Sequence, residues 1–425
     1  MLAKEINFFK SHPLPMRVLL LTNLIYALVL PIIELFIGAY IMRKSDDISL
    51  VVIFQLSLYI GIPATFMLNG FLLKHFKISR LYSLGMLLSG ISMTAMMALD
   101  ELTTWGIFGT GLIMGLSYGF FWANRDYLAL NTTKDGNRNY YYGIETFFYT
   151  IAGIIIPLGA GAFIAATKSN DWFDGNIYVA YYCLAAFVIA LTILASILVH
   201  KGNFQNPART PFVFFKFHPL WNKMLRLSAL KGIAQGYIVT APVMLIRTLV
   251  GEEGSLGSIL SIAAFLSAIL LYILGRSTKP EHRLKIFSIG IAIFLVGAIL
   301  NASLYSALGA ILFVLCLSFA RPLMDISYFP IQLQVIDFVS AKEKRNDFAY
   351  IFNHEIGLLI GRLIGCGLFI VLARYSSEYV ALRYALLVIA AVQFLSIFMA
   401  KSIINDKAWK EPHVEVPPIA QPMNL

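Results

Sequence analysis

The sequence predicts an all-α integral membrane protein with twelve transmembrane helices arranged in two six-helix halves. Three observations support this prediction: the composition, the length of the apolar runs and the distribution of basic residues. Hydrophobic residues make up 59% of the 425 residues and charged residues 13%, against roughly 25% charged in soluble domains. A chain of this composition cannot bury its apolar surface in water.

Long apolar runs separated by short polar breaks extend over most of the chain, for example Val18–Met42, Ile177–Val199 and Leu284–Leu300. About 20 residues suffice to cross the hydrocarbon of a bilayer. Lipid offers a backbone no hydrogen-bond partner, and continuous rather than alternating hydrophobicity favours helices over barrel strands. We predict helices over 17–43, 49–73, 81–99, 105–131, 140–167, 177–200, 224–249, 255–276, 284–301, 306–336, 348–373 and 379–401.

The longest connection lies between the sixth and seventh predicted helices and contains Pro207, Pro211 and Pro219. It divides the chain into a six-helix bundle over 1–200, a cytoplasmic linker over 201–223 and a second six-helix bundle over 224–401. The proline-containing remainder, 402–425, is expected to be a disordered cytoplasmic tail.

Basic residues are distributed unequally between the two ends of the predicted bundle. Of the 33 Lys and Arg, 23 fall in the tails and alternate loops on one side, six fall on the other side and four lie inside helices. Because basic residues in short loops stay cytoplasmic, we expect a multi-pass protein of the cytoplasmic membrane with both termini in the cytoplasm. This topology explains the net charge of +10 without a nucleic-acid partner.

Several functional classes are disfavoured by the motifs that the sequence lacks. It contains neither a Gly-x4-Gly-Lys-Ser/Thr phosphate-binding loop nor a His-Glu-x2-His element. The three cysteines, Cys183, Cys316 and Cys366, all lie in apolar runs, which argues against a disulfide framework or a zinc site. We therefore expect no enzymatic activity, no cofactor and no metal, and any active transport must draw on a gradient.

The two halves carry matching features in the same order. Tyr26-x4-Pro31 in the first helix recurs as Tyr237-x4-Pro242 in the seventh. The other matches are Arg125 and Asp126 with Arg321 and Asp325, and Glu145 with Glu355. A parallel repeat of two six-helix units is typical of alternating-access transporters, and the chain resembles the major facilitator superfamily over roughly residues 15–400.

The local motifs of that superfamily are present only in degenerate form. Gly70–Arg80, between the second and third helices, keeps the glycine and the basic character of the signature, but Lys74 replaces its aspartate. Gly153-x3-Pro157-Leu158-Gly159-Ala160-Gly161 loosely resembles the glycine- and proline-rich motif of proton-linked antiporters. Pro157, like Pro31 and Pro242, is a site where a helix can bend, although ordinary close helix packing explains the glycines equally well.

Ionisable residues inside hydrocarbon cost roughly 2.5–3.5 kcal/mol each to insert and are therefore candidates for function. Glu34, three residues after Pro31, is the only acid in the first helix. An isolated buried carboxylate suits proton binding and release; the alternative is a structural pair with a basic residue. The resemblance implies that this helix lines a central cavity.

Two further sets of charged residues lie inside the predicted helices. Arg125, Asp126 and Glu145 are expected near the cytoplasmic end of the first half, where an Arg125–Glu145 pair would form a structural clamp or gate rather than a substrate contact. The second half contributes proton- or substrate-binding candidates, namely Arg321, Asp325, Glu355 and Arg362.

Two roles are open for these second-half residues. Arg321 and Arg362 could bind an anion, in which case an Arg362→Gln variant would lose anion transport, or Arg321 and Glu355 could neutralise each other. Lys231 is expected to extend its amine to the membrane interface.

The sequence thus predicts a monomeric secondary transporter that moves a small solute by alternating access, coupled to protons, in efflux, exchange or cotransport. Two alternatives remain: a lipid flippase built on the same scaffold, and a membrane sensor that does not transport.

Overall fold

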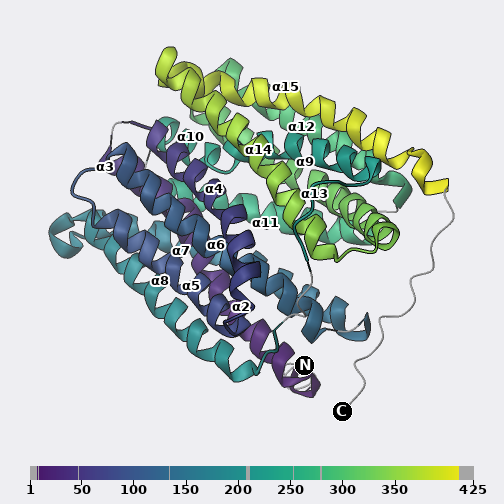
Figure 1. Cartoon of the computed structure of the whole chain (residues 1–425). Helices are drawn as coiled ribbons and strands as arrows, with labels where there is room; N and C mark the ends of the chain where they lie inside the picture. The colour runs from purple at the N-terminus through teal and green to yellow at the C-terminus, as the bar shows by residue number, and fades with distance from the viewer. Residues whose placement is uncertain are drawn as a thin grey trace.

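The structure, a computed structural model, describes residues 7, 9–45, 47–133, 135–206, 211–251, 253–277 and 280–410. These residues form helices joined by short loops and contain no strand (Figure 1). Most of the predicted tail, residues 411–425, lies outside the described residues.

The first half contains six membrane-spanning segments. The first is a continuous span made of three pieces, an α-helix, a π-helical turn and a second α-helix. In chain order the elements are α2 (Leu14–Pro31), η1 (Ile32–Phe36), α3 (Ile37–Lys44), α4 (Ser49–Leu72), α5 (Ile78–Met97), α6 (Thr104–Thr132), α7 (Asp135–Ser169) and α8 (Ile177–Val199).

The second half repeats this plan. Its first span is again interrupted, here between α9 and α10, close to the proline that matches Pro31. The elements are α9 (Pro219–Ile238), α10 (Ala241–Leu249), α11 (Glu253–Ser277), α12 (Arg283–Leu304), α13 (Ala307–Glu343), α14 (Asp347–Tyr375) and α15 (Glu378–Ile404), followed by the short 3-10 helix η5 (Lys407–Lys410).

The lengths of these segments fit a bilayer. Among the described residues, ten helical segments are long and apolar enough to cross it, and α11 adds a shorter apolar stretch, Gly254–Leu270. α5, 20 residues long, packs between α6 and α8. The predicted twelve-helix fold is thereby confirmed.

The largest boundary differences occur at polar helix ends. α13 continues to Glu343 instead of ending at 336, α7 begins at Asp135 instead of 140, and α9 begins at Pro219 instead of 224. Hydropathy marks the part of a helix that lies in hydrocarbon, whereas backbone hydrogen bonding continues into the polar interface. Each of these helices therefore extends beyond its apolar run.

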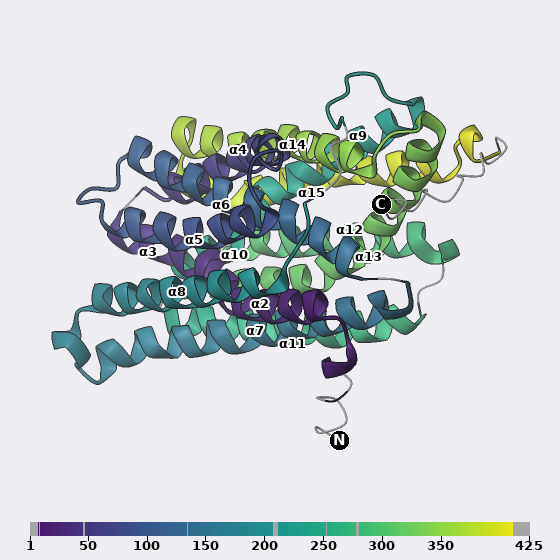
Figure 2. The same cartoon turned by 60° about the horizontal axis from the view of Figure 1, so that its bottom comes forward.

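We call the end where α2 and α9 begin and α15 finishes the basic side, and the end with the loops after α3 and α10 the opposite side. In Figure 1 the elements of the first half gather at lower left and most of the second half at upper right, with α3 and α10 at one end of the molecule. The halves are joined by contacts of α4 with α14, α7 with α11, α3 with α10 and α4 with α9, and Figure 2 shows α7 and α11 side by side.

Close helix packing inside each half depends on glycines. A Cβ on Gly115 of α6 would overlap the Leu58 carbonyl oxygen of α4 and lie 2.8 Å from the Gly61 Cα. Gly361 of α14 has the same relation to Ala229 of α9. These glycines bring the helix backbones into direct contact.

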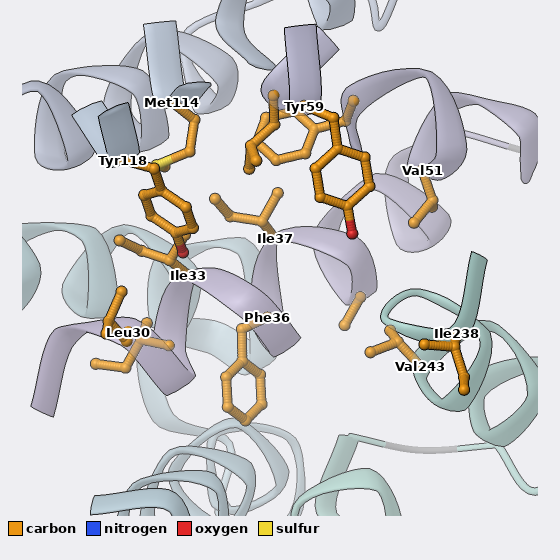
Figure 3. Packing of buried hydrophobic residues seen from close by; sticks show 14 of the residues in the cluster. Leu30, Ile33, Phe36, Ile37, Val51, Tyr59, Met114, Tyr118, Ile238 and Val243 are labelled. Atoms are coloured by element: carbon orange, nitrogen blue, oxygen red, sulfur yellow. The ribbon is translucent and has the colours of Figure 1, made fainter. Parts of the chain in front are cut away.

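Apolar side chains join the halves on the opposite side. Gly38 of α3 faces Val243 of α10, and a Cβ on Gly38 would lie 3.8 Å from the Val243 Cβ. Ile37 and Val51 of the first half belong to the same apolar cluster as Ile238 and Val243 of the second, and Figure 3 labels all four. A polar link is added by the Ile48 N–H, which donates at 3.1 Å to Oε1 of Glu378, the first residue of α15.

The linker contacts both halves on the basic side. Asn206 bonds to the α4–α5 connection, donating to the carbonyl oxygens of Leu73 (2.9 Å) and Phe76 (2.7 Å). The Phe212 ring covers Gly70 of α4. The same ring lies 5.5 Å from the ring of Phe348 in α14.

Candidate functional site

A buried network in the first half is centred on Glu145 of α7, which is 2% exposed. Arg125 of α6 donates from Nε to Glu145 Oε1 at 3.0 Å, and its second amino group forms an ion pair with Oε2. Asn23 of α2 donates to Glu145 Oε1 at 2.6 Å, and Tyr141 donates to the same atom at 3.1 Å. One carboxylate thus ties α2, α6 and α7 together.

The expected Arg125–Glu145 contact is therefore present, and both partners belong to the same half. Asp126 accepts a hydrogen bond from Arg125 at 2.6 Å while its side chain is 44% exposed. The network lies toward the basic side, because α6 ends and α7 begins there. This geometry suits a structural clamp within the first half better than a gate between the halves.

A second charged group crosses from one half to the other. Arg362 of α14 donates to Glu355 at 3.1 Å and twice to Gln235 Oε1 of α9, at 2.9 and 3.1 Å. Its guanidinium lies 4.6 Å from the ring centre of Tyr59, which belongs to α4 of the first half. The Tyr59 hydroxyl in turn donates to the backbone carbonyl oxygen of Gln235 at 2.9 Å. Arg362, 8% exposed, is a buried link rather than an open binding group.

A third group lies between α9 and α13. Lys231 donates to Asp325 Oδ1 at 2.6 Å and lies 4.0 Å from the ring centres of Tyr328 and Phe329. Arg321 approaches the other oxygen of Asp325 only at 3.9 Å, and its side chain is 63% exposed. A cavity of about 50 Å³ adjoins this group, which is room for a water molecule or two rather than a solute.

Two expectations about pairing were wrong. Lys231 does not extend to the interface, because Asp325 and two aromatic rings hold its amine inside the bundle. Glu355 pairs with Arg362, not with Arg321. Both errors have one cause: the rotation of each helix about its axis decides which neighbour a side chain meets, and spacing along the chain does not fix that rotation between helices.

Glu34 lies in η1 and is exposed although it sits well inside the first span. Its charge interacts with that of Arg321 in the other half, and with the hydroxyl groups of Tyr26 and Tyr118. Figure 3 shows the Tyr118 ring beside Ile33, the neighbour of Glu34. Glu34 thus lies within electrostatic range of a charge in the other half. Of the four residues proposed in the second half, Arg321 is the one whose charge acts on Glu34.

The three prolines predicted to bend helices differ in their surroundings. The π-helical turn Ile32–Phe36 follows Pro31 directly, and Pro242 lies in the first turn of α10, just after the interruption of the seventh span. Pro157 lies inside the continuous helix α7, where its carbonyl oxygen contacts Gly257 of α11. The matching prolines thus accompany matching irregularities in the two halves.

Sequence reasoning missed the uncharged members of these networks. Asn23 and Gln235 each provide the amide that joins a charged pair to another helix, and Tyr59 provides the contact across the halves. The buried His354 shares a hydrogen bond between its Nε2 and the Tyr328 hydroxyl, 2.6 Å apart. Asn23 and Gln235 were detectable as amides within apolar runs.

Two six-helix halves, with their first spans interrupted at matching places, form the fold of a polytopic membrane transporter. A family model described as Major Facilitator Superfamily matches residues 18–365. The chain belongs to the major facilitator superfamily, a family of secondary transporters.

Curated relatives extend over much of the chain without indicating a substrate. The uncharacterized protein YqgE of Bacillus subtilis (strain 168) is 22% identical over 384 residues, which cover 89% of this chain and 87% of that protein. An uncharacterized protein in the sodM 3' region of Geobacillus stearothermophilus is 23% identical over 141 residues, or 33% of this chain and 66% of that one.

Solved structures share the fold at low identity. The nucleoside transporter NupG has a TM-score of 0.63 at 16% identity, with 93% of this chain and 100% of that chain covered. A structure from proton-dependent oligopeptide transporters has a TM-score of 0.66 at 11% identity, covering 92% and 98%. A bacterial metal transporter has a TM-score of 0.60 at 12% identity, covering 92% and 99%. These similarities concern the fold alone.

Proposed function

We propose that the protein is a proton-coupled secondary transporter that moves a small solute across the cytoplasmic membrane by alternating access. Glu34 is the proton-binding group, and the solute binds between the halves near Arg321. The basic side faces the cytoplasm, and the protein acts as a monomer in the lipid bilayer.

The observation that carries this proposal is the exposure of Glu34 deep inside the first span, within electrostatic range of Arg321, whose side chain is 63% exposed. Charged groups held at this depth are costly unless they serve transport or pair with one another. On the opposite side, α3 packs against α10. This arrangement fits a carrier with its central space open toward the basic side.

Alternating access is tested without knowing the solute. In a variant whose three native cysteines are replaced, Glu34→Cys is labelled with a membrane-impermeant maleimide from either side of oriented vesicles. A carrier exposes this residue to each side in turn, so we expect labelling from both sides. Labelling from the cytoplasmic side alone, under all conditions, would fit a sensor and contradict the proposal.

Proton coupling is tested on the protein reconstituted in liposomes, with a solute identified by thermal stabilisation. An imposed pH gradient should accelerate solute flux through the unmodified protein. In Glu34→Gln the gradient should have no effect, while exchange of labelled for unlabelled solute continues. Equal fluxes with and without the gradient in the unmodified protein would refute proton coupling but leave transport standing.

A further inference from the structure

The charged side chains of the two second-half groups around Lys231 and Arg362 do not balance. Lys231, Arg321 and Arg362 supply three positive charges, and Asp325 and Glu355 supply two negative ones. Two pairs form at close range: Arg362 with Glu355 at 3.1 Å and Lys231 with Asp325 at 2.6 Å. One positive charge is in excess.

The excess charge is located on Arg321. Its Nε lies 3.9 Å from Asp325 Oδ2, beyond hydrogen-bond distance, because the amine of Lys231 already holds that carboxylate on its other oxygen. With 63% of its side chain exposed, Arg321 has donors directed into accessible space. The side chain of Arg362, by contrast, is 9% exposed. Its Nε and one amino group donate to Gln235, and its other amino group donates to Glu355.

Two first-half groups lie within electrostatic range of Arg321, namely the Glu34 carboxyl and the Tyr59 hydroxyl. Among the residues that the structure describes, Glu34 interacts electrostatically with Arg321 of the second half and with Tyr26 and Tyr118 of its own half. The first-half network of Arg125, Asp126 and Glu145 is joined internally and does not supply a counter-charge to Arg321. When Glu34 is ionised, it balances Arg321; when Glu34 is protonated, the excess charge returns.

We propose that Arg321 binds a small singly charged oxyanion, a carboxylate or a phosphate, which takes the place of the Glu34 carboxylate as its counter-charge. This assignment rests on the function proposed above and adds the substrate class. Guanidinium binds both kinds of oxyanion with two parallel hydrogen bonds. Because the anion and the Glu34 carboxylate compete for one cation, binding of the anion favours binding of a proton to Glu34, and the two cross together. Cotransport is thereby favoured over exchange.

The test measures anion binding to the purified protein by thermal stabilisation, using lactate, benzoate and inorganic phosphate, with lactamide and benzamide as neutral counterparts. We expect at least one anion to stabilise the protein and its amide not to. Arg321→Gln should weaken that binding by roughly 10- to 100-fold, since one charged pair of hydrogen bonds is lost. Arg283→Gln, a surface change at the start of α12, is the matched control and should bind as the unmodified protein does.

Proton uptake distinguishes this proposal from simple anion binding. In weakly buffered solution, at a pH where Glu34 is ionised, the stabilising anion should cause uptake of about one proton per anion bound, and Glu34→Gln should bind the anion without uptake. Comparing the stabilisation by lactate and benzoate with that by inorganic phosphate identifies which oxyanion the protein prefers.

Three results would overturn the proposal: amides that stabilise as well as the anions, anion binding that survives Arg321→Gln, or no stabilisation by any of the three anions. If Glu34→Cys is nevertheless labelled from both sides, alternating access stands and only the substrate class fails. If that labelling is one-sided, the proposed function fails first.

Discussion

At the residue scale, Glu145 shows how one carboxylate can hold three helices. It accepts from Arg125, Asn23 and Tyr141 while almost completely buried. Removing one partner of a buried ion pair costs about 3–5 kcal/mol, because the other charge is left without compensation. We therefore expect Glu145→Gln to lower the melting temperature of the detergent-purified protein strongly.

Two control variants distinguish the effect of the Arg125–Glu145 ion pair on stability from that of the neighbouring residues. Asp126→Asn changes a carboxylate that is 44% exposed and should have a small effect. The double variant Arg125→Gln/Glu145→Gln removes both charges and should recover part of the lost stability. A double variant less stable than Glu145→Gln alone would show that the buried charge is not the cause.

A second residue-scale prediction concerns Gly115. A Cβ there would overlap the backbone of α4, whereas a Cβ on Gly109 of the same helix would meet nothing within 4 Å. Gly115→Ala should destabilise the protein by about 1–3 kcal/mol, as overpacking does, and Gly109→Ala should not. Thermal unfolding of the two variants tests the difference; equal melting temperatures would contradict the assigned packing.

The residues of the candidate site were partly predictable from the sequence. Glu34, Arg321 and Arg362 stand out because charges inside apolar runs are rare. Their partners did not stand out: that Glu355 meets Arg362 and Lys231 meets Asp325 depends on how α9, α13 and α14 are rotated about their axes. The role of Gln235 depends on the same packing. The sequence identifies which buried charges need a partner, whereas the packing of the helices decides which residue that partner is.

At the element scale, the linker touches both halves through one ring. Phe212 packs on Gly70 of α4 and lies 5.5–5.8 Å from the rings of Phe348 and Phe352 in α14. Phe212→Ala should loosen this contact on the basic side. We expect faster maleimide labelling of Glu34→Cys from that side.

Phe215, in the same linker but 94% exposed, provides the matched control. Phe215→Ala should leave the labelling rate unchanged. If both variants label equally fast, the contact of Phe212 with the two halves has no influence on access.

The helices themselves were predictable to within a few residues because apolar length marks them directly. Their interruptions were predictable only where a proline marked them: Pro31 precedes η1, and Pro242 follows the gap between α9 and α10. The polar ends of α7 and α13 were not predictable from the sequence. Hydropathy does not distinguish a helix that continues into the interface from one that stops there.

At the scale of the whole molecule, the contact between α3 and α10 can be fixed covalently. A Cβ on Gly38 would lie 3.8 Å from the Val243 Cβ, within the range of roughly 3.5–4.5 Å found in disulfides. In the cysteine-replaced background, Gly38→Cys/Val243→Cys should therefore cross-link on mild oxidation. Transport should stop when the bond forms and return on reduction.

Each single cysteine variant is the control for this prediction and should transport regardless of oxidant. Continued flux through fully cross-linked protein would mean that the α3–α10 contact does not open during the transport cycle, which contradicts alternating access on the opposite side.

The unbalanced charge of Arg321 has a thermodynamic consequence. If one anion and one proton cross together, no net charge moves, so the membrane voltage does no work on the cycle. Only the concentration ratios matter, and at equilibrium the anion accumulates about tenfold per unit of pH difference. In liposomes, a potassium diffusion potential set with valinomycin should leave the accumulation ratio unchanged, whereas each step in internal pH should change it.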